Sequence, residues 1–226
     1  MTTDPTGRLA GERTDYLSGS LADDAPADPL ALFDVWLGEA FARRSEHGDL
    51  PEPSAAVLST VALGADGTPR PRSRTVLLKG HDARGVVVYT NYDSAKGREL
   101  AALPHAALLL PWYPLQRQVR IEGAVEQVPA AESDAYWAQR PRGSQLGAWA
   151  SCQSHGIGSR EALEEQYAAA EQRFAGGEVP PPEFWGGLRL RPRRMEFWQW
   201  RAHRVHDRIL YERAADGGWG RRRLQP

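Results

Sequence analysis

Between residues 55 and 128 the chain alternates short β-rich segments with tight turns, and few folds accommodate such a series. The clearest turns are residues 64–67 and 80–85, both rich in Gly and Asp. Short strands joined by tight turns, with further strands after residue 185, predict a mainly antiparallel β-barrel. The expected strands are Ala55 to Leu63, Arg74 to Leu78, Val86 to Asn91, Ala106 to Trp112, Gln116 to Val128, Glu196 to Trp200, Asp207 to Tyr211 and Trp219 to Leu224.

Helices are expected around this barrel. Asp28 and Pro29 resemble an N-cap followed by a proline at the first helical position, and apolar residues then recur at helical spacing through Arg44. Further helices are expected near residues 94–103, 130–139 and 159–174, with 140–154 as a polar, Gly-rich binding loop. The fold class is therefore α+β, mainly β with peripheral helices. Residues 28–226 form one domain, and residues 1–27 form a flexible arm.

Composition narrows the class of protein. The chain has 226 residues, of which 41% are hydrophobic and 25% charged, as in globular proteins. No apolar run is long enough to span a membrane and no signal peptide is recognisable, so we expect a cytoplasmic protein. Cys152 is the single cysteine, which excludes an internal disulfide and a cysteine metal pair. A formal net charge of -1 argues against a nucleic-acid partner.

Cations cluster in two places that suit an anionic ligand. Arg204, His206 and Arg208 are spaced by two, so they would share one face if the segment is extended. A solvated basic edge strand explains that spacing equally well. Lys79 and Lys96 are the only two lysines among 28 Lys and Arg residues, and Lys96 falls in the first turn of an expected helix. A helix N-terminus beside a lysine is suited to phosphate.

A series of motifs in a fixed order then points to one family. The order is Arg-x-x-Leu-Leu-Lys, Tyr-Thr-Asn, Gln-Arg-Gln-Val, Arg-Pro-Arg-x-Ser-Gln, Gln-Ser, Phe-Trp-Gly-Gly, and Glu-Phe-Trp-Gln with His-Arg-x-His-Asp-Arg. From about Arg13 to the C-terminus this resembles the pyridoxamine 5'-phosphate oxidase family. The resemblance implies an FMN-binding split β-barrel that forms a homodimer with FMN at the interface. It also implies oxidation of pyridoxamine or pyridoxine 5'-phosphate to pyridoxal 5'-phosphate, with O2 as acceptor and H2O2 as product.

The resemblance also assigns residues by position. It implies that Arg204 and His206 are catalytic, orienting the substrate, with His206 able to assist proton loss. Arg13 and Tyr16 are expected to act as a lid, and no metal is expected. The implied FMN contacts are Arg74, Thr75, Val76, Leu77, Leu78, Lys79, Tyr89, Thr90, Lys96, Gln118, Gln153, Ser154, Trp198 and Arg208. The implied substrate contacts are Lys79, Tyr136, Arg140, Ser144, Arg204, His206, Arg13 and Tyr16.

Three departures from the family pattern keep alternatives open. Ala95 stands where an arginine is common, the segment 67–74 is about two residues longer, and Trp200-Arg201-Ala202 replaces a smaller, typically Gly-containing stretch. One alternative is a paralogue that oxidises another small aromatic metabolite with FMN. Another is a non-catalytic module whose Arg-rich end binds nucleic acid, although no nucleic-acid motif is recognisable.

Overall fold

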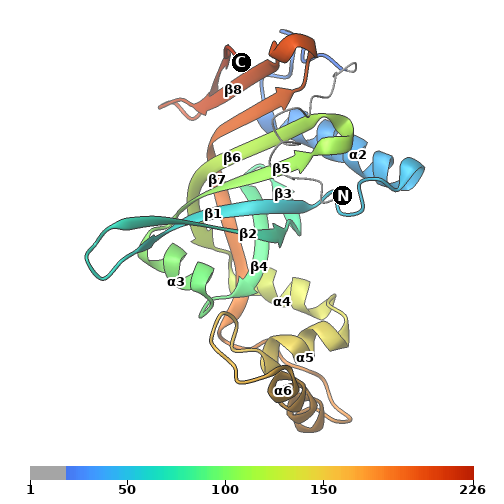
Figure 1. Cartoon of the computed structure of the whole chain (residues 1–226), viewed down its shortest axis with the longest axis vertical. Helices are drawn as coiled ribbons and strands as arrows, with labels where there is room; N and C mark the ends of the chain where they lie inside the picture. The colour runs from blue at the N-terminus through green and yellow to red at the C-terminus, as the bar shows by residue number, and fades with distance from the viewer. Residues whose placement is uncertain (1–18) are drawn as a thin grey trace, which may run out of the picture.

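The computed structural model describes residues 19–226, and within that range nine strands form one antiparallel sheet (Figure 1). The sheet follows the order β2-β1-β5-β6-β7-β4-β3, with β8 on β7 and β9 on β8. The strands are β1 (Ala55–Leu63), β2 (Pro69–Leu77), β3 (Gly80–Asp82), β4 (Gly85–Asn91), β5 (His105–Trp112), β6 (Arg117–Gln127), β7 (Trp185–Gln199), β8 (Asp207–Arg213) and β9 (Trp219–Arg223). The sheet curls into a barrel that is not closed, which agrees with the expected split barrel.

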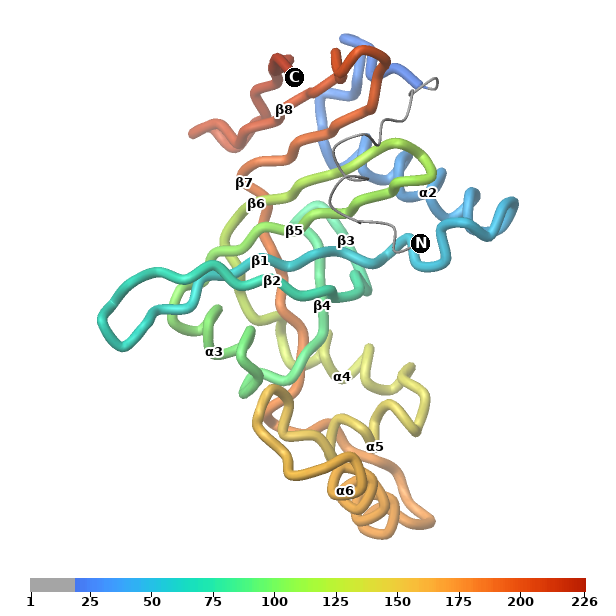
Figure 2. The backbone as a smooth tube through the Cα atoms, viewed as in Figure 1, coloured from blue at the N-terminus to red at the C-terminus, as the bar shows by residue number. Residues whose placement is uncertain are grey.

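β7 is the strand with the most partners in the sheet, since it pairs with β4, β6 and β8. Its first residues pair with β4 and its last residues with β8, while β6 runs along nearly its whole length. The register of β6 and β7 shifts at Glu122 and Gly123. A Cβ on Gly123 would lie 1.9 Å from the Arg191 carbonyl oxygen, so this irregularity requires glycine. Figure 2 shows β7 continuing from the helices near α4 to the opposite end of the molecule near β8.

The strand β2 is longer than expected. It begins at Pro69 and includes Pro71, whereas the sequence pattern predicted a start at Arg74. Proline cannot donate a hydrogen bond within a sheet, and β2 tolerates both prolines because it is an edge strand paired only with β1.

Helix α2 (Pro29–His47) covers one end of the barrel and confirms the predicted first helix. The Asp28 carboxylate caps it by accepting from the Leu30 N–H, and Gly48 ends it in the left-handed region at φ 71°. Phe33 and Trp36 on its inner face are at most 4% exposed, and Trp36 packs edge-on against Phe197 of β7. These contacts join α2 to the main core inside the barrel.

The remaining helices are α3 (Ala95–Ala102), α4 (Ala130–Ala138), α5 (Arg142–Ala150) and α6 (Arg160–Arg173), with short 3-10 turns η1 (Tyr113–Leu115) and η2 (Ala202–Arg204). Helix α5 corrects the expectation of a loop over 140–154. Leu146 and Ala150, four residues apart, are buried in a second core with Trp137 and Trp185, and this packing outweighs the glycines of the segment. None of the described helices is long and apolar enough to cross a membrane.

Residues 19–27, the described part of the expected arm, lie against the C-terminal strands. Arg223 pairs with Asp23 and also donates to the Leu21 carbonyl at 2.9 Å. The Tyr211 hydroxyl donates to the Pro26 carbonyl at 2.7 Å. These contacts join both ends of the described chain at one end of the barrel (Figure 1).

Candidate functional site

Lys96 lies in a buried polar pocket at the start of α3. Its side-chain Nζ donates to the Thr90 hydroxyl at 3.1 Å, the Ser94 hydroxyl at 3.3 Å and the Gln153 amide oxygen at 2.9 Å. All three acceptors are neutral, and no carboxylate among residues 19–226 forms an ion pair with this ammonium. Burial, then the nearby Arg74 charge, lower the pKa of Lys96, while Glu99 opposes them. A desolvated ammonium at a helix N-terminus fits a phosphate group.

Arg74 approaches the same helix from β2. Its guanidinium pairs with the Glu99 carboxylate at 2.6 Å and also donates to the Thr60 hydroxyl. The Thr60 hydroxyl donates to the same carboxylate, so Arg74 is held in place by two neighbours. The structure thus places two predicted cofactor contacts, Arg74 and Lys96, on the same side of the barrel.

Beside this pocket is a cavity of about 280 Å3 between β4 and α5. Its lining includes Tyr89, Thr90, Arg140, Ser144 and Gln153. It therefore brings together three predicted cofactor contacts and two predicted substrate contacts. Thr90 and Gln153 also accept from Lys96, so the cavity and the lysine pocket share a wall.

Aromatic rings orient Arg140 in that cavity. Tyr89 stacks on Tyr136 at 3.9 Å and on Trp185 at 5.5 Å, and the Arg140 guanidinium lies 4.9 Å above the Trp185 ring. Arg140 donates to the Ser144 carbonyl at 3.0 Å, but its Nε is buried and has no acceptor among the described residues. An anionic ligand would supply the missing acceptor.

A second group of predicted residues lies at the other end of β7. Gln118, Trp198 and Arg208 are paired in register across β6, β7 and β8, so these three neighbours lie side by side. Glu196, which is 5% exposed, holds the Arg208 guanidinium at 2.7 Å and also pairs with Arg120. Sequence reasoning missed Glu196, although its position two residues before Trp198 places both on one face of the strand.

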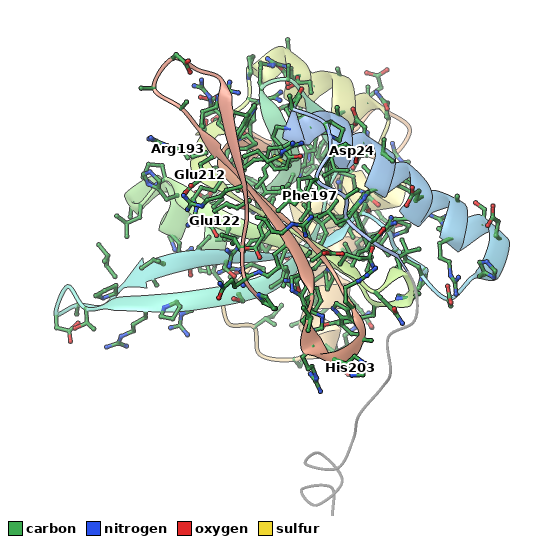
Figure 3. All side chains as sticks on the ribbon, turned by 90° about the horizontal axis from the view of Figure 1, so that it is seen from above. Asp24, Glu122, Arg193, Phe197, His203 and Glu212 are labelled. Carbon is green, nitrogen blue, oxygen red and sulfur yellow. The ribbon has the colours of Figure 1, made fainter. Side chains whose placement is uncertain are left out.

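Arg204 and His206 lie in the turn between β7 and β8 and not on a strand. The expectation that they share a strand face with Arg208 is wrong, because β8 begins at Asp207 and the preceding turn is irregular. His203 and Arg204 have φ values of 58° and 64°, a region that side chains rarely adopt. Such backbone strain concentrates at functional sites. Figure 3 shows His203 at the tip of this turn, away from the core residue Phe197.

His206 has a defined environment within the turn. Its Nδ1 accepts a hydrogen bond from the Arg201 backbone N–H at 3.1 Å, so the neutral ring carries its proton on Nε2. The ring packs on Trp198, with centroids 4.6 Å apart. Burial, followed by the charge of Arg204, lowers the pKa of His206. This histidine is therefore arranged as a neutral hydrogen-bond donor near neutral pH.

The two groups of residues are far apart on one chain. Trp185 lines the Arg140 cavity and Trp198 belongs to the second group, and twelve residues of extended strand lie between them. At about 3.3 Å per residue this is roughly 40 Å along β7. Figure 1 shows the same separation, with α4 and α5 at one end of the molecule and β8 at the other. One chain does not bring both groups to a single ligand.

Other predicted residues are more scattered. Lys79 lines a different cavity of about 460 Å3 with residues of α2, so the structure does not unite it with Arg140. Thr75 and Leu77 are exposed on the edge strand, Val76 packs on the core and Leu78 is buried. Ser154 is exposed, with φ 71°, just after Gln153. Arg13 and Tyr16 lie outside the described residues, and within residues 19–226 no cluster of metal-ligating side chains occurs.

Two family models match most of the chain. Residues 46–174 match the model described as pyridoxamine 5'-phosphate oxidase, and residues 185–226 match the pyridoxine 5'-phosphate oxidase C-terminal dimerisation region. A pyridoxine/pyridoxamine 5'-phosphate oxidase of Rubrobacter xylanophilus is 53% identical, with 96% of each chain covered. One from Synechocystis is 50% identical and covers 96% of this chain and 98% of its own length.

Solved structures show the same similarity. PhzG from Burkholderia lata, in complex with tetrahydrophenazine-1-carboxylic acid, superposes with a TM-score of 0.80 at 35% identity, covering 90% of this chain and 95% of that chain. A pyridoxamine 5'-phosphate oxidase-related, FMN binding protein from Nostoc punctiforme gives a TM-score of 0.66 at 19% identity, covering 92% and 100% of the two chains, and confirms the fold. Together with the matched family models, these relatives show that the chain belongs to the pyridoxamine 5'-phosphate oxidase family.

Proposed function

We propose that this protein oxidises pyridoxamine or pyridoxine 5'-phosphate to pyridoxal 5'-phosphate, with O2 as electron acceptor and H2O2 as product. The cofactor is FMN. The observation that carries the proposal is the pair of adjoining anion sites, one at Lys96 and one at Arg140, which share Thr90 and Gln153. Two neighbouring phosphate sites suit a phosphorylated cofactor beside a phosphorylated substrate.

Each pocket is assigned by its chemistry. The Lys96 pocket, with the α3 N-terminus and Arg74 beside it, holds the FMN phosphate. The Arg140 cavity, with Ser144 in the first turn of α5 and the Tyr136 ring stacked on its lining residue Tyr89, holds the substrate phosphate. FMN carries out the two-electron oxidation itself, so the protein needs to bind and align the substrate and supplies no nucleophile.

The active unit is a homodimer in which each site combines the two separated groups. One subunit contributes Lys96, Gln153 and Arg140, and its partner contributes the group near Trp198 with Arg204 and His206. Two observations support this arrangement. The groups lie at opposite ends of β7 on one chain, and the second group falls within the region matched by the dimerisation model, 185–226.

His206 and Arg204 position the substrate in this arrangement. The His206 Nε2–H is a donor for an oxygen on the substrate ring. The fixed positive charge of Arg204 is suited to the same oxygen-bearing side of the substrate ring. Because the His206 Nδ1 already accepts from Arg201, a role as proton acceptor through that nitrogen is disfavoured. The expected acid-base role is thereby reduced to a positioning role.

A second candidate is oxidation of an aromatic carboxylate, since PhzG was solved in complex with one and is 35% identical. The Arg140 and Ser144 pair favours the phosphorylated vitamer. Mixing the purified flavoprotein anaerobically with pyridoxamine 5'-phosphate, and watching the flavin absorbance bleach, tests the proposal directly. Bleaching by an aromatic carboxylate alone would support the second candidate, and recovery of FAD or of no flavin after reconstitution would reject the cofactor assignment.

A further inference from the structure

We propose that Arg201 is a positioning residue that couples the N-terminal segment at Gly19 to His206. The inference rests on the proposed function, because it takes the turn carrying Arg204 and His206 to contact the substrate. Arg201 lies immediately before η2, at the start of that turn, and its side chain and its backbone bind two different parts of the molecule.

The side chain of Arg201 binds the N-terminal segment. Its Nη1 donates to the Gly19 carbonyl at 2.6 Å, and its Nε lies 3.6 Å from the Asp207 carboxylate. Asp207 accepts from the Leu21 backbone N–H at 3.1 Å with the same oxygen. Arg201, Gly19, Leu21 and Asp207 therefore form a closed ring of contacts that links the segment to both ends of the turn.

Gly19 is suited to this contact by its own geometry. Its φ is 86°, and a Cβ added there would lie 2.8 Å from the Gln199 side chain. Glycine therefore lets the segment approach the end of β7 closely enough for the Arg201 guanidinium to reach its carbonyl.

The backbone of Arg201 orients His206. Its N–H donates to the His206 Nδ1 at 3.1 Å, which selects the ring tautomer with the proton on Nε2 and restrains the orientation of the ring. The intervening turn contains two residues in the left-handed region, His203 and Arg204. This strained backbone persists only if contacts with the surrounding structure stabilise it. Anchoring Arg201 through its side chain keeps its N–H in the direction that His206 requires. Arg201 belongs to Trp200-Arg201-Ala202, one of the segments in which this sequence departs from the family pattern.

Kinetics of Arg201→Ala, Arg201→Lys and a control test the coupling in the FMN-loaded full-length enzyme. We expect Arg201→Ala to raise KM for pyridoxine 5'-phosphate roughly 3- to 30-fold, with a smaller fall in kcat, because Arg201 acts through His206 and only part of the roughly 10- to 150-fold effect of a lost charge-assisted hydrogen bond reaches the substrate. Arg201→Lys should restore part of the loss because an ammonium also donates to a carbonyl. The Kd for FMN should stay within about twofold of the parent value, because the substitution removes no cofactor contact.

Arg221→Ala is the matched control. Arg221 also binds carbonyls of the N-terminal segment, at Asp23 and Ala25, but it has no contact with the turn. We expect Arg221→Ala to lower Tm and leave KM unchanged. Equal shifts of KM in the two alanine variants, or no shift in either, would overturn the coupling and leave Arg201 as one more tether of the segment.

An activity-independent measurement separates this inference from the proposed function. The 15N chemical shifts of His206, assigned by comparison with His206→Gln, report which ring nitrogen carries the proton. We expect a single Nε2–H form in the parent and Arg221→Ala, and a mixture of tautomers in Arg201→Ala. Identical His206 shifts in parent and Arg201→Ala would reject the coupling even if the enzyme turns over. Failure of the parent to oxidise pyridoxine 5'-phosphate would reject the proposed function and leave the NMR comparison to decide the coupling.

Discussion

Replacing Lys96 with methionine is expected to weaken FMN binding without destabilising the apoprotein. The Lys96 side chain is 9% exposed, and its ammonium binds only the neutral oxygens of Thr90, Ser94 and Gln153. A buried ammonium without a carboxylate partner carries a desolvation penalty, which methionine removes while filling a similar volume. The phosphate of FMN, by contrast, would lose its charge-assisted partner.

The substitution should change FMN binding more than it changes the stability of the apoprotein. A hydrogen bond to a charged group contributes about 1.5 to 3 kcal/mol, so the Kd for FMN should rise roughly 10- to 150-fold. In the apoprotein the lost hydrogen bonds to neutral oxygens oppose the relief of desolvation. The net change in the free energy of unfolding should stay within about 1 kcal/mol, which corresponds to a Tm shift of about 2 to 4 °C for a chain of this size.

Titration of apoprotein with FMN, followed by quenching of flavin fluorescence, measures the Kd, and calorimetry measures the Tm. Arg98→Met is the matched control, since Arg98 is an exposed cation on the same helix that donates to the Asp93 carbonyl. Its Kd should stay within about threefold of the parent value, as is usual for exposed charges. Equal Kd values for parent and Lys96→Met, or equal losses in both variants, would refute the placement of the phosphate beside Lys96.

The pH dependence of the apoprotein provides a second check on the same residue. The pKa of Lys96 is lowered, first by burial and then by Arg74, so the folded state releases this proton at a lower pH than the unfolded chain. The contribution of Lys96 to stability should therefore increase with pH between the lowered pKa and the ordinary value of 10.5. Lys96→Met should lack this increase. Parallel stability profiles of the two proteins up to that pH would contradict the lowered pKa.

Three further outcomes are expected. Ala95→Arg, at the first residue of α3, should lower the Kd for FMN roughly 5- to 30-fold. If Arg72 already binds the FMN phosphate in place of an arginine at position 95, that gain should vanish and Arg72→Ala should weaken FMN binding. Titration of both single variants and the double variant with FMN separates the two cases. Arg204→Ala should lower kcat/KM for pyridoxine 5'-phosphate by a factor on the order of 10 to 1,000 while FMN stays bound, and unchanged kinetics would make this arginine ordinary surface. The same variant should raise the pKa of His206, because burial and then the Arg204 charge hold it below 6.5; an NMR titration that shows no rise would exclude the electrostatic contact.

Local signals in the sequence predicted some elements well. The first helix was predictable because its start at Asp28 and Pro29 and its inner residues Phe33 and Trp36 are specified within a few positions. Most of the short strands between residues 55 and 128 were predictable for the same reason, whereas Gly80–Asp82, expected within a turn, forms the strand β3 paired with β4. The start of β2 was not, because the prolines at 69 and 71 are tolerated only on an edge strand, and strand order is not a local property.

The site was only partly predictable, since its geometry depends on tertiary contacts. Motif order identified Lys96, Gln153 and Arg140, but only the structure shows that Thr90 and Gln153 serve two adjoining pockets. The strand-face argument for Arg204 failed because alternation assumes extended backbone, and a left-handed residue breaks it. Glu196 escaped notice because a single carboxylate within a strand carries no signal until its partners are known.

The distance along β7 between the two groups of site residues has a genetic consequence under the proposed dimer. Consider Arg140→Ala, which impairs the cavity beside α5, and Arg204→Ala, which impairs the turn before β8. Each variant alone has both of its sites damaged. In a dimer of one Arg140→Ala subunit and one Arg204→Ala subunit, one site contains both substitutions and the other contains neither. Random reassortment of equal amounts makes about half of the dimers mixed, so two weakly active proteins should together recover about a quarter of the parental activity. Two defective alleles of this gene would then complement each other within one cell.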